Sequence, residues 1–130
     1  MRDIPLSVPA FYPLHSVRMD CLFCKIVSGE IPATRLFEDE QVLAFADLHP
    51  QAPVHILLIP KQHFGSLDHT TGDDAGILGH LLSATAKVAR QNNLASGYRV
   101  VVNTGDDGGQ TVNHLHVHLL GGRSLGWPPG

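Results

Sequence analysis

Residues 108–120, GGQTVNHLHVHLL, alternate imidazole and aliphatic side chains directly after a glycine-rich loop. Successive side chains of a β-strand point to opposite faces, and residues i, i+2 and i+4 share one face. A strand over residues 113–120 would therefore line one face with three imidazole rings and bury the aliphatic residues between them. The Cα atoms of consecutive histidines would lie about 6.6 Å apart, because the rise of a strand is ~3.3 Å per residue. The three histidines are His114, His116 and His118.

The spacing of the three rings limits what they can do together. Two histidines at i and i+2 can share a metal ion, but the outer two rings start about 13 Å apart and do not converge on one ion without strong bending. At least one ring therefore has a function other than binding that ion, unless the strand merely exposes its histidines to water. The adjoining loop suggests that this function involves a bound anion. Gly105, Gly108 and Gly109 permit the positive φ angles with which backbone N–H groups converge on an anion.

The pattern of the remaining chain predicts a meander of strands and two helices. Apolar spacing after Cys21 fits a short helix that ends at Ser28-Gly29, and a longer apolar stripe predicts a helix over residues 73–92 that covers one side of the sheet. Short runs of aromatic and β-branched residues between turn-forming residues predict the strands. These runs span residues 35–38, 42–47, 54–59, 98–103 and 113–120.

Length and charge restrict the class of protein. A chain of 130 residues suits one compact domain. Nine Lys and Arg against twelve Asp and Glu leave a net charge of -3, which gives no basic surplus for a nucleic-acid partner. No run approaches the roughly 20 apolar residues of a membrane span, and no secretory signal pattern is present, so we expect a cytoplasmic protein without a membrane partner.

The first residues differ from the rest. Residues 1–18 carry three prolines and no periodicity, and Met19 stands just before the first patterned segment. We expect residues 1–19 to be a flexible N-terminal extension, or a start assigned too early, and residues 20–130 to be the folded domain.

Phosphoryl chemistry suits the histidine segment. An uncharged His116 can attack phosphorus and form a nucleotidyl-histidine, which water then hydrolyses. His118 would hold the non-bridging oxygens, while the loop amides would stabilise the charge of the transition state. We expect His55 to accept the other ring proton of His116 and thereby to fix its tautomer. Asn103 and Thr111 would add side-chain donors.

Several segments together carry a family resemblance. HLHVHLL resembles the His-x-His-x-His motif of the histidine triad (HIT) superfamily. The match extends over residues 20–130 and is similar to the Hint branch, the nucleoside phosphoramidate hydrolases. The matching segments are FCKIVSGEIP (23–32), FEDEQVLAFADLHPQAPVHILLIPKQH (37–63), GYRVVVN (97–103), GGQTVNHLHVHLLGGR (108–123) and WPPG (127–130).

The resemblance implies an α+β fold in which a five-stranded antiparallel sheet joins that of a second subunit into a ten-stranded dimer sheet. It also implies a purine nucleotide substrate, AMP or GMP joined to an amine, whose hydrolysis needs no cofactor. His116 matches the nucleophile, Asp47 the carboxylate that holds the ribose hydroxyls, and His55 a relay residue. The positions that match nucleotide contacts are Phe23, Phe45, Asp47, Leu48, Asn103, Gly109, Gln110, Thr111, His116 and His118.

Two positions depart from the pattern of the Hint branch. Thr111 stands where many members have serine, and Asn113 stands where an aromatic residue is common. Because Thr111 keeps the hydroxyl that would meet the leaving group, we expect activity. Residues 127–130 resemble the Hint tail that reaches toward the other subunit's site, which argues against the dinucleoside polyphosphate hydrolases of the same superfamily.

The two cysteines form a Cys-x-x-Cys pair, which in a reducing compartment favours a metal half-site or plain packing over a disulfide. Some bacterial HIT proteins carry such a pair and bind a structural zinc. The matching ligands here are Cys21, Cys24, His63 and His114, a closed tetrahedral set that would leave His116 free. The alternative is that both cysteines are ordinary small apolar residues of a helix.

Three other functions compete with the phosphoramidase. A nucleotide-binding adaptor would bind AMP with incidental hydrolysis, and a dinucleoside polyphosphate hydrolase would cleave a phosphoanhydride. A metal-dependent hydrolase built on His55, His114 and His116 would lose activity in excess chelator.

Overall fold

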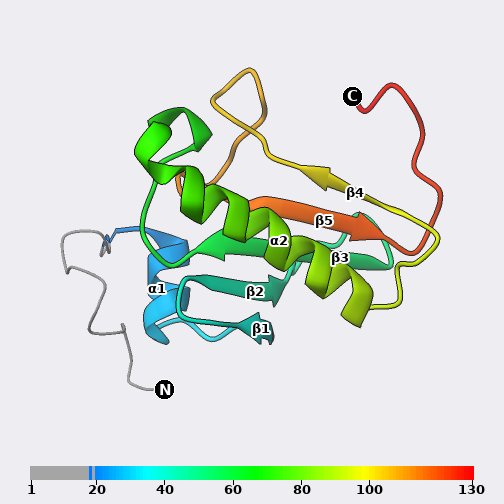
Figure 1. Ribbon diagram of the computed structural model, residues 1–130, viewed down its shortest axis with the longest axis horizontal. Coiled ribbons are helices and arrows are strands. Elements are labelled where there is room, and N and C mark those ends of the chain that lie inside the picture. Colours follow the sequence, from blue (N-terminus) through cyan, green and yellow to red (C-terminus); the bar gives the residue numbers. More distant parts are fainter. Residues whose placement is uncertain (1–17, 19) are drawn as a thin grey trace.

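The computed structural model describes residues 18 and 20–130, which form one five-stranded antiparallel sheet with a helix on each face (Figure 1). The strand order is β1-β2-β3-β5-β4. The predicted α+β fold with one short and one long helix is confirmed. The elements are α1 (Leu22–Ser28), β1 (Arg35–Glu38), β2 (Val42–Ala46), β3 (Val54–Pro60), α2 (Ala75–Gln91), β4 (Tyr98–Val101) and β5 (Val117–Gly121), with 3₁₀ turns at Leu67–His69 and Gly72–Asp74. Apart from Arg18, the predicted extension of residues 1–19 lies outside the described residues.

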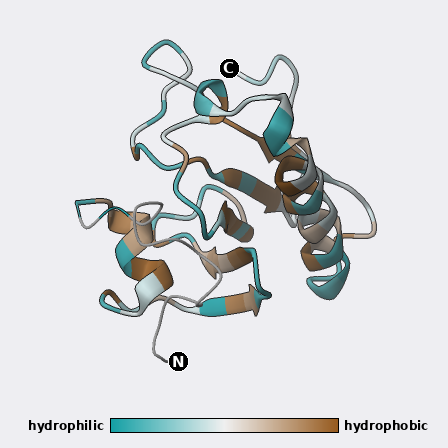
Figure 2. Cartoon of the chain, turned by 60° about the vertical axis from the view of Figure 1, so that its left-hand side comes forward, coloured by the Kyte–Doolittle hydropathy of each residue, from teal (hydrophilic) through white to brown (hydrophobic). Residues whose placement is uncertain are grey.

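The two faces of the sheet bury different clusters of side chains. Along β3, Ile56 and Leu58 pack against the cluster that includes α2, whereas Leu57 and Ile59 pack against the cluster that includes α1. This alternation follows from the two-residue period of a strand. Figure 2 shows the two helices on opposite sides of the sheet, each with both apolar and polar segments. The central strands are therefore buried on both sides.

The short helix α1 carries the cysteine pair. The Cys21 sulfur accepts a hydrogen bond from the backbone N–H of Cys24 and so caps the first turn. Gly29 ends the helix in the left-handed conformation, with φ 86°, which glycine adopts without a steric penalty. Its buried residues are Phe23, Cys24, Ile26 and Val27. Capping at both ends thus holds a helix of seven residues against the sheet.

The long helix α2 starts at Ala75, two residues later than predicted. A capping box between Thr71 and Asp74 closes the preceding 3₁₀ turn, so the acidic residues expected in the first helical turn lie before it. Its buried stripe, Leu81, Ala84, Thr85, Val88 and Ala89, faces the sheet. Among residues 18 and 20–130, no helix is both long and apolar enough to cross a bilayer.

The last strand differs from the prediction, because β5 begins at Val117 rather than at residue 113. Val117 pairs with Leu58, so continuing the ladder by two residues would place Leu115 opposite Pro60. Proline has no N–H to donate, and the ladder stops there. Leu115 instead donates its N–H to the carbonyl of Phe64 at 2.7 Å. Only His118 of the three histidines therefore lies on the strand.

Candidate active site

A cavity of about 280 Å³ opens between α1 and the sheet, on the face opposite α2. Apolar side chains make one part of its wall, and His116 and His118 make another. Asp47 and the exposed Leu48, directly after β2, form part of its rim. The cavity thus brings together, from the predicted site, Phe23, Phe45, Asp47, Leu48, Thr111, His116 and His118.

His116 presents one unprotonated ring nitrogen at this cavity. Its Nδ1 lies 2.7 Å from the main-chain oxygen of His114, which can only accept, so Nδ1 carries the proton and Nε2 keeps its lone pair. Burial lowers the pKa of His116, and the neighbouring His114 ring lowers it further. Phe23 packs edge-on against the ring, with 5.2 Å between the ring centroids. His116, which directly precedes β5, is thus a neutral imidazole with a fixed orientation.

His55 contacts His118 and not His116, so the predicted partner of His55 is wrong. His55 Nε2 lies 2.9 Å from His118 Nδ1 and 3.4 Å from Asp47 Oδ2. The antiparallel register explains the pairing, because His118 lies opposite Leu57 and His55 is its diagonal neighbour on the same face. Burial, reinforced by the neighbouring rings of His116 and His55, lowers the pKa of His118 to about 4.

Asp47 is held at the rim by its own turn. Its Oδ1 accepts the N–H of His49 at 2.8 Å, and its N–H donates to the carbonyl of His55 at 3.1 Å. The second carboxylate oxygen faces His55. A carboxylate fixed in this way at a cavity rim is suited to accept hydrogen bonds from a pair of hydroxyls.

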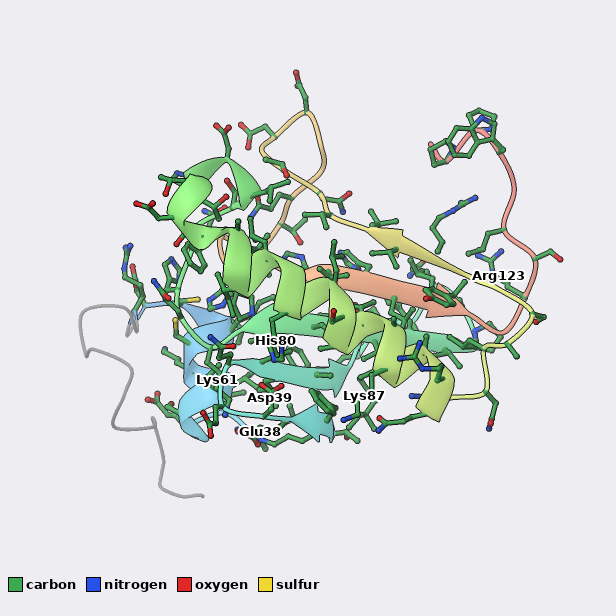
Figure 3. All side chains as sticks on the ribbon, in the orientation of Figure 1. Glu38, Asp39, Lys61, His80, Lys87 and Arg123 are labelled. Carbon is green, nitrogen blue, oxygen red and sulfur yellow. The ribbon has the colours of Figure 1, made fainter. Side chains whose placement is uncertain are left out.

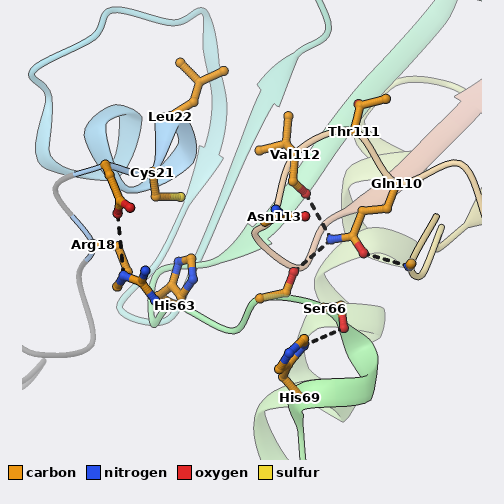
Figure 4. A pocket seen from close by; sticks show the side chains of 13 residues that line it. Arg18, Cys21, Leu22, His63, Ser66, His69, Gln110, Thr111, Val112 and Asn113 are labelled. Carbon is orange, nitrogen blue, oxygen red and sulfur yellow. Dashed lines mark hydrogen bonds and ion pairs between the residues drawn. The ribbon is translucent and has the colours of Figure 1, made fainter.

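The glycine-rich loop is shaped by the side chain of Gln110 (Figure 4). Its Nε2 donates to the carbonyls of Gly65 and Val112 at 2.8 and 2.9 Å, while its Oε1 accepts the N–H of Gly105 at 3.0 Å. The amide is therefore occupied in holding the loop, and Thr111 follows it at the cavity wall. Three residues of the predicted nucleotide site do not line this cavity, namely Asn103, Gly109 and Gln110.

A second cluster brings Cys21, Cys24, His63 and His114 together, with one ligand atom of each within 4.8 Å of the others. The Cys21 Sγ to His114 Nδ1 distance is 3.3 Å, Cys24 Sγ to His63 Nδ1 is 3.4 Å, and the two Nδ1 atoms are 3.2 Å apart. A tetrahedron with Zn–S near 2.3 Å and Zn–N near 2.0–2.1 Å has edges of about 3.3–3.6 Å between nitrogen and nitrogen or nitrogen and sulfur. The cluster therefore fits a zinc ion.

The surroundings of the cluster also suit a metal. His114 Nε2 donates to the carbonyl of Pro60 at 2.9 Å, which leaves Nδ1 unprotonated toward the cysteines, as a metal ligand requires. Hydrogen bonds with Cys24 and His114 lower the pKa of Cys21, so one thiol of the pair ionises readily. A catalytic metal on His55, His114 and His116 is not supported, because His114 points into the cysteine cluster and His55 pairs with His118.

Two features of the site were not predicted from the sequence. The Gln110 bridge joins segments 45 residues apart, and Arg123 donates to a carbonyl 72 residues away. Neither contact has a periodic signal, because each depends on which loops the fold brings side by side.

Comparison with known proteins agrees with this geometry. The family model of the HIT domain matches residues 28–125. The Arabidopsis thaliana protein named adenylylsulfatase HINT1 is 52% identical over 111 residues, which cover 84% of this chain and 76% of that protein. The Zea mays 14 kDa zinc-binding protein is also 52% identical over 111 residues, covering 84% and 87%. The crystal structure of a HIT family hydrolase from Legionella pneumophila matches with a TM-score of 0.84 and 51% identity, covering 85% of this chain and all of that chain.

The chain belongs to the HIT family, since the family model matches well over half of its length. Within that family it is similar to a HINT1 protein, which confirms the predicted resemblance to the Hint branch.

Proposed function

We propose that the protein is a purine nucleoside phosphoramidase, a hydrolase that cleaves the P–N bond between AMP or GMP and an amine. One observation carries this proposal: the His116 ring donates from Nδ1 to a main-chain oxygen and therefore offers the Nε2 lone pair at a cavity. A neutral imidazole with a fixed tautomer is a competent nucleophile toward phosphorus.

The reaction proceeds in two displacements. In the first, the Nε2 lone pair of His116 forms a bond to phosphorus, the substrate P–N bond breaks, and the amine leaves with a proton that the Thr111 hydroxyl donates and regains from solvent water. In the second, water attacks phosphorus and releases one proton to solvent, the His116–phosphorus bond breaks with its electron pair returning to Nε2, and the free nucleotide leaves. The sum is phosphoramidate and water giving nucleotide and amine. His118 donates a hydrogen bond to a non-bridging oxygen in both steps.

The cavity also supports a nucleotide as the ligand. Phe23, Phe45 and Leu57 give an apolar surface for a planar base, and Asp47 would accept the ribose hydroxyls. Thr111 lines the cavity and would approach the phosphate. The backbone N–H groups of Gly109 and Gln110 donate to the carbonyls of Asp106 and Gly105 at 3.0 and 3.1 Å, so they would have to leave these partners to bind it, and Asn103 lies outside the cavity lining. This arrangement needs no cluster of lysine or arginine.

We also propose that Cys21, Cys24, His63 and His114 hold a structural zinc ion. The distances fit, and the relative from Zea mays is named a zinc-binding protein. When bound, zinc would cross-link α1 to the segments before and after α2. The ion would have four protein ligands and no open position, so the chemistry would stay with His116.

A homodimer completes the proposal. β4 is an edge strand, and its Tyr98 and Val100 side chains are exposed although both are large and apolar. An exposed edge of this kind favours pairing with a second chain. Two such edges would join into a ten-stranded sheet and bring residues 127–130 of one subunit toward the other subunit's site.

A second candidate is hydrolysis of adenylyl sulfate, because the relative from Arabidopsis thaliana is named adenylylsulfatase. The same attack by His116 would release sulfate instead of an amine. Sulfate leaves as an anion and needs no proton, so the two activities differ in their need for the Thr111 hydroxyl.

Replacement of His116 tests the proposal. His116→Ala should abolish turnover of an adenosine phosphoramidate while AMP affinity stays within a few-fold of wild type. His80→Ala is the matched control, because His80 contacts Asp39 and lies on α2, across the sheet from the cavity. Wild-type protein that binds AMP tightly but hydrolyses no phosphoramidate would favour the adaptor instead. Loss of activity in a chelator that leaves the fold intact would favour a catalytic metal.

A further inference from the structure

The connection between β2 and β3 contains a hydrogen bond that the reaction above does not use. The backbone N–H of Gln51 donates to His55 Nδ1 at 3.0 Å. A backbone N–H can only donate, so this ring nitrogen must be the acceptor. His55 itself lies at the start of β3 and is 7% exposed, which protects the contact from exchange with water.

This contact fixes the tautomer of His55. A neutral imidazole that accepts at Nδ1 carries its single proton on Nε2. That proton points at His118 rather than at Asp47, because His55 Nε2 lies 2.9 Å from His118 Nδ1 and 3.4 Å from Asp47 Oδ2. The alternative, in which His55 accepts at both nitrogens, would require an imidazolate anion.

The same reasoning extends to His118. Because its Nδ1 accepts the proton of His55, His118 must carry its own proton on Nε2. His118 lines the reaction cavity, and its Nε2 makes no hydrogen bond to any residue of the described chain. The outcome is an N–H donor without a partner among the described residues, on a ring that lines the cavity, and a phosphoryl oxygen can accept from such a donor.

The Gln51 peptide is itself held in place from its other side. Arg123, which follows β5, donates from Nη2 to the carbonyl of Gln51 at 2.9 Å and from Nη1 to the carbonyl of Ser124 at 3.1 Å (Figure 3). Gly122, with φ 89°, lies so close to Pro53 that an added Cβ would come within 2.9 Å of the proline side chain. The segment after β5 therefore packs directly on the connection.

We propose that the Gln51 peptide, held by Arg123, sets the tautomers of His55 and His118 and so presents an N–H of His118 to the phosphoryl group. Gln51 and Arg123 are positioning residues, since neither lines the cavity. The orientation of the rings follows from the structure alone, and only the role of that N–H in turnover rests on the proposed function.

Nitrogen NMR on the ligand-free wild-type protein tests the proton positions without any substrate. We expect His55 and His118 each to show a protonated Nε2 and an unprotonated Nδ1. Couplings across the hydrogen bonds should connect Gln51 N with His55 Nδ1, and His55 Nε2 with His118 Nδ1. A His118 ring protonated at Nδ1 would overturn the inference whatever the activity of the protein.

A pair of substitutions at residue 51 separates the peptide from the side chain. Gln51→Ala keeps the backbone N–H, so tautomers and turnover should match those of wild type. Gln51→Pro removes the N–H, and we expect mixed tautomers with kcat about tenfold lower and KM within about twofold. Equal kcat and tautomers in the two variants would refute the role of the peptide.

Arg123→Ala provides an independent test if Gln51→Pro does not fold. We expect it to broaden or shift the ring nitrogens of His55 and His118 and to lower kcat by about threefold, with partial recovery in Arg123→Lys. Arg90→Ala, which removes an equal charge from the exposed end of α2, is the control. Unchanged ring nitrogen signals of His55 and His118 in Arg123→Ala would show that Arg123 is not a positioning residue. A wild-type protein with the expected tautomers but no phosphoramidase activity would refute the proposed function and leave this inference standing.

Discussion

His114 takes part in two sites through different atoms. Its ring Nδ1 faces the cysteine cluster, whereas its main-chain oxygen accepts the Nδ1 proton of His116. Phe23, which lies between the two cysteines, contacts both rings edge-on. The orientation of His116, the proposed nucleophile, thus depends on residues that also form or contact the cysteine cluster.

Thr111 is predicted to support turnover through its hydroxyl. Thr111→Val keeps the shape of the side chain but removes the donor, so kcat for a phosphoramidate with a poor amine leaving group should fall by about 10²-fold. Thr111→Ser should keep most of the activity. Steady-state kinetics with a series of amines would measure this, and equal losses in both variants would contradict it.

Glu38 is predicted to stabilise the fold through Lys61, whose side chain is only 5% exposed and lies 2.6 Å from Glu38 Oε2 (Figure 3). Glu38→Gln weakens the pairing of this buried ammonium. Because Glu38 is itself about a third exposed, we expect a loss near the low end of ~1–3 kcal/mol. Urea unfolding at neutral pH measures it, with the exposed neighbour Glu40→Gln as the control.

The same pair predicts a pH dependence. Burial opposes ionisation of Glu38, but the hydrogen bond and charge of Lys61, followed by Arg35, hold its pKa below the ordinary 4.5. The stabilisation is therefore complete above pH 4.5 and is lost as the pH falls below that value. Unfolding curves should show the gap between wild type and Glu38→Gln closing in acid. A gap that widened there would contradict the assignment.

Among the elements, α1 depends most on the cluster, since Cys24 lies within its seven residues and Cys21 is its N-cap. Removal of zinc should lower Tm, by about 4 °C for each kcal/mol of lost stability, and should lower kcat because His114 moves with α1. Zinc, but not magnesium, should restore both. Unchanged Tm and ring signals of His116 after verified metal removal would contradict the coupling.

The sequence predicted those elements whose periodicity is local. The alternation of imidazole and aliphatic residues correctly predicted that Leu115, Val117 and Leu119 pack in one core and that the histidines lie on the other face. The start of β5 was wrong because it depends on Pro60 lying opposite, and the partner of His55 was wrong because it depends on register. Both facts belong to strand pairing, which one sequence does not reveal.

For the whole molecule, the proposed dimer predicts different behaviour at the two edges of the sheet. Val100→Asp places a charge on β4 and should give a monomer by light scattering, whereas Leu36→Asp on β1, which is also exposed, should leave the dimer intact. Turnover should fall with dissociation if residues 127–130 act on the other subunit. A monomeric wild-type protein with full activity would contradict this arrangement.

Mass spectrometry after brief mixing with an adenosine phosphoramidate tests the central claim most directly. Quenching under neutral denaturing conditions should leave an adenylyl group on the tryptic peptide of residues 100–123, and fragmentation should place it on His116. The group should appear and decay at rates that account for turnover. Full turnover with no labelled peptide, or with the label on His118, would contradict attack by His116.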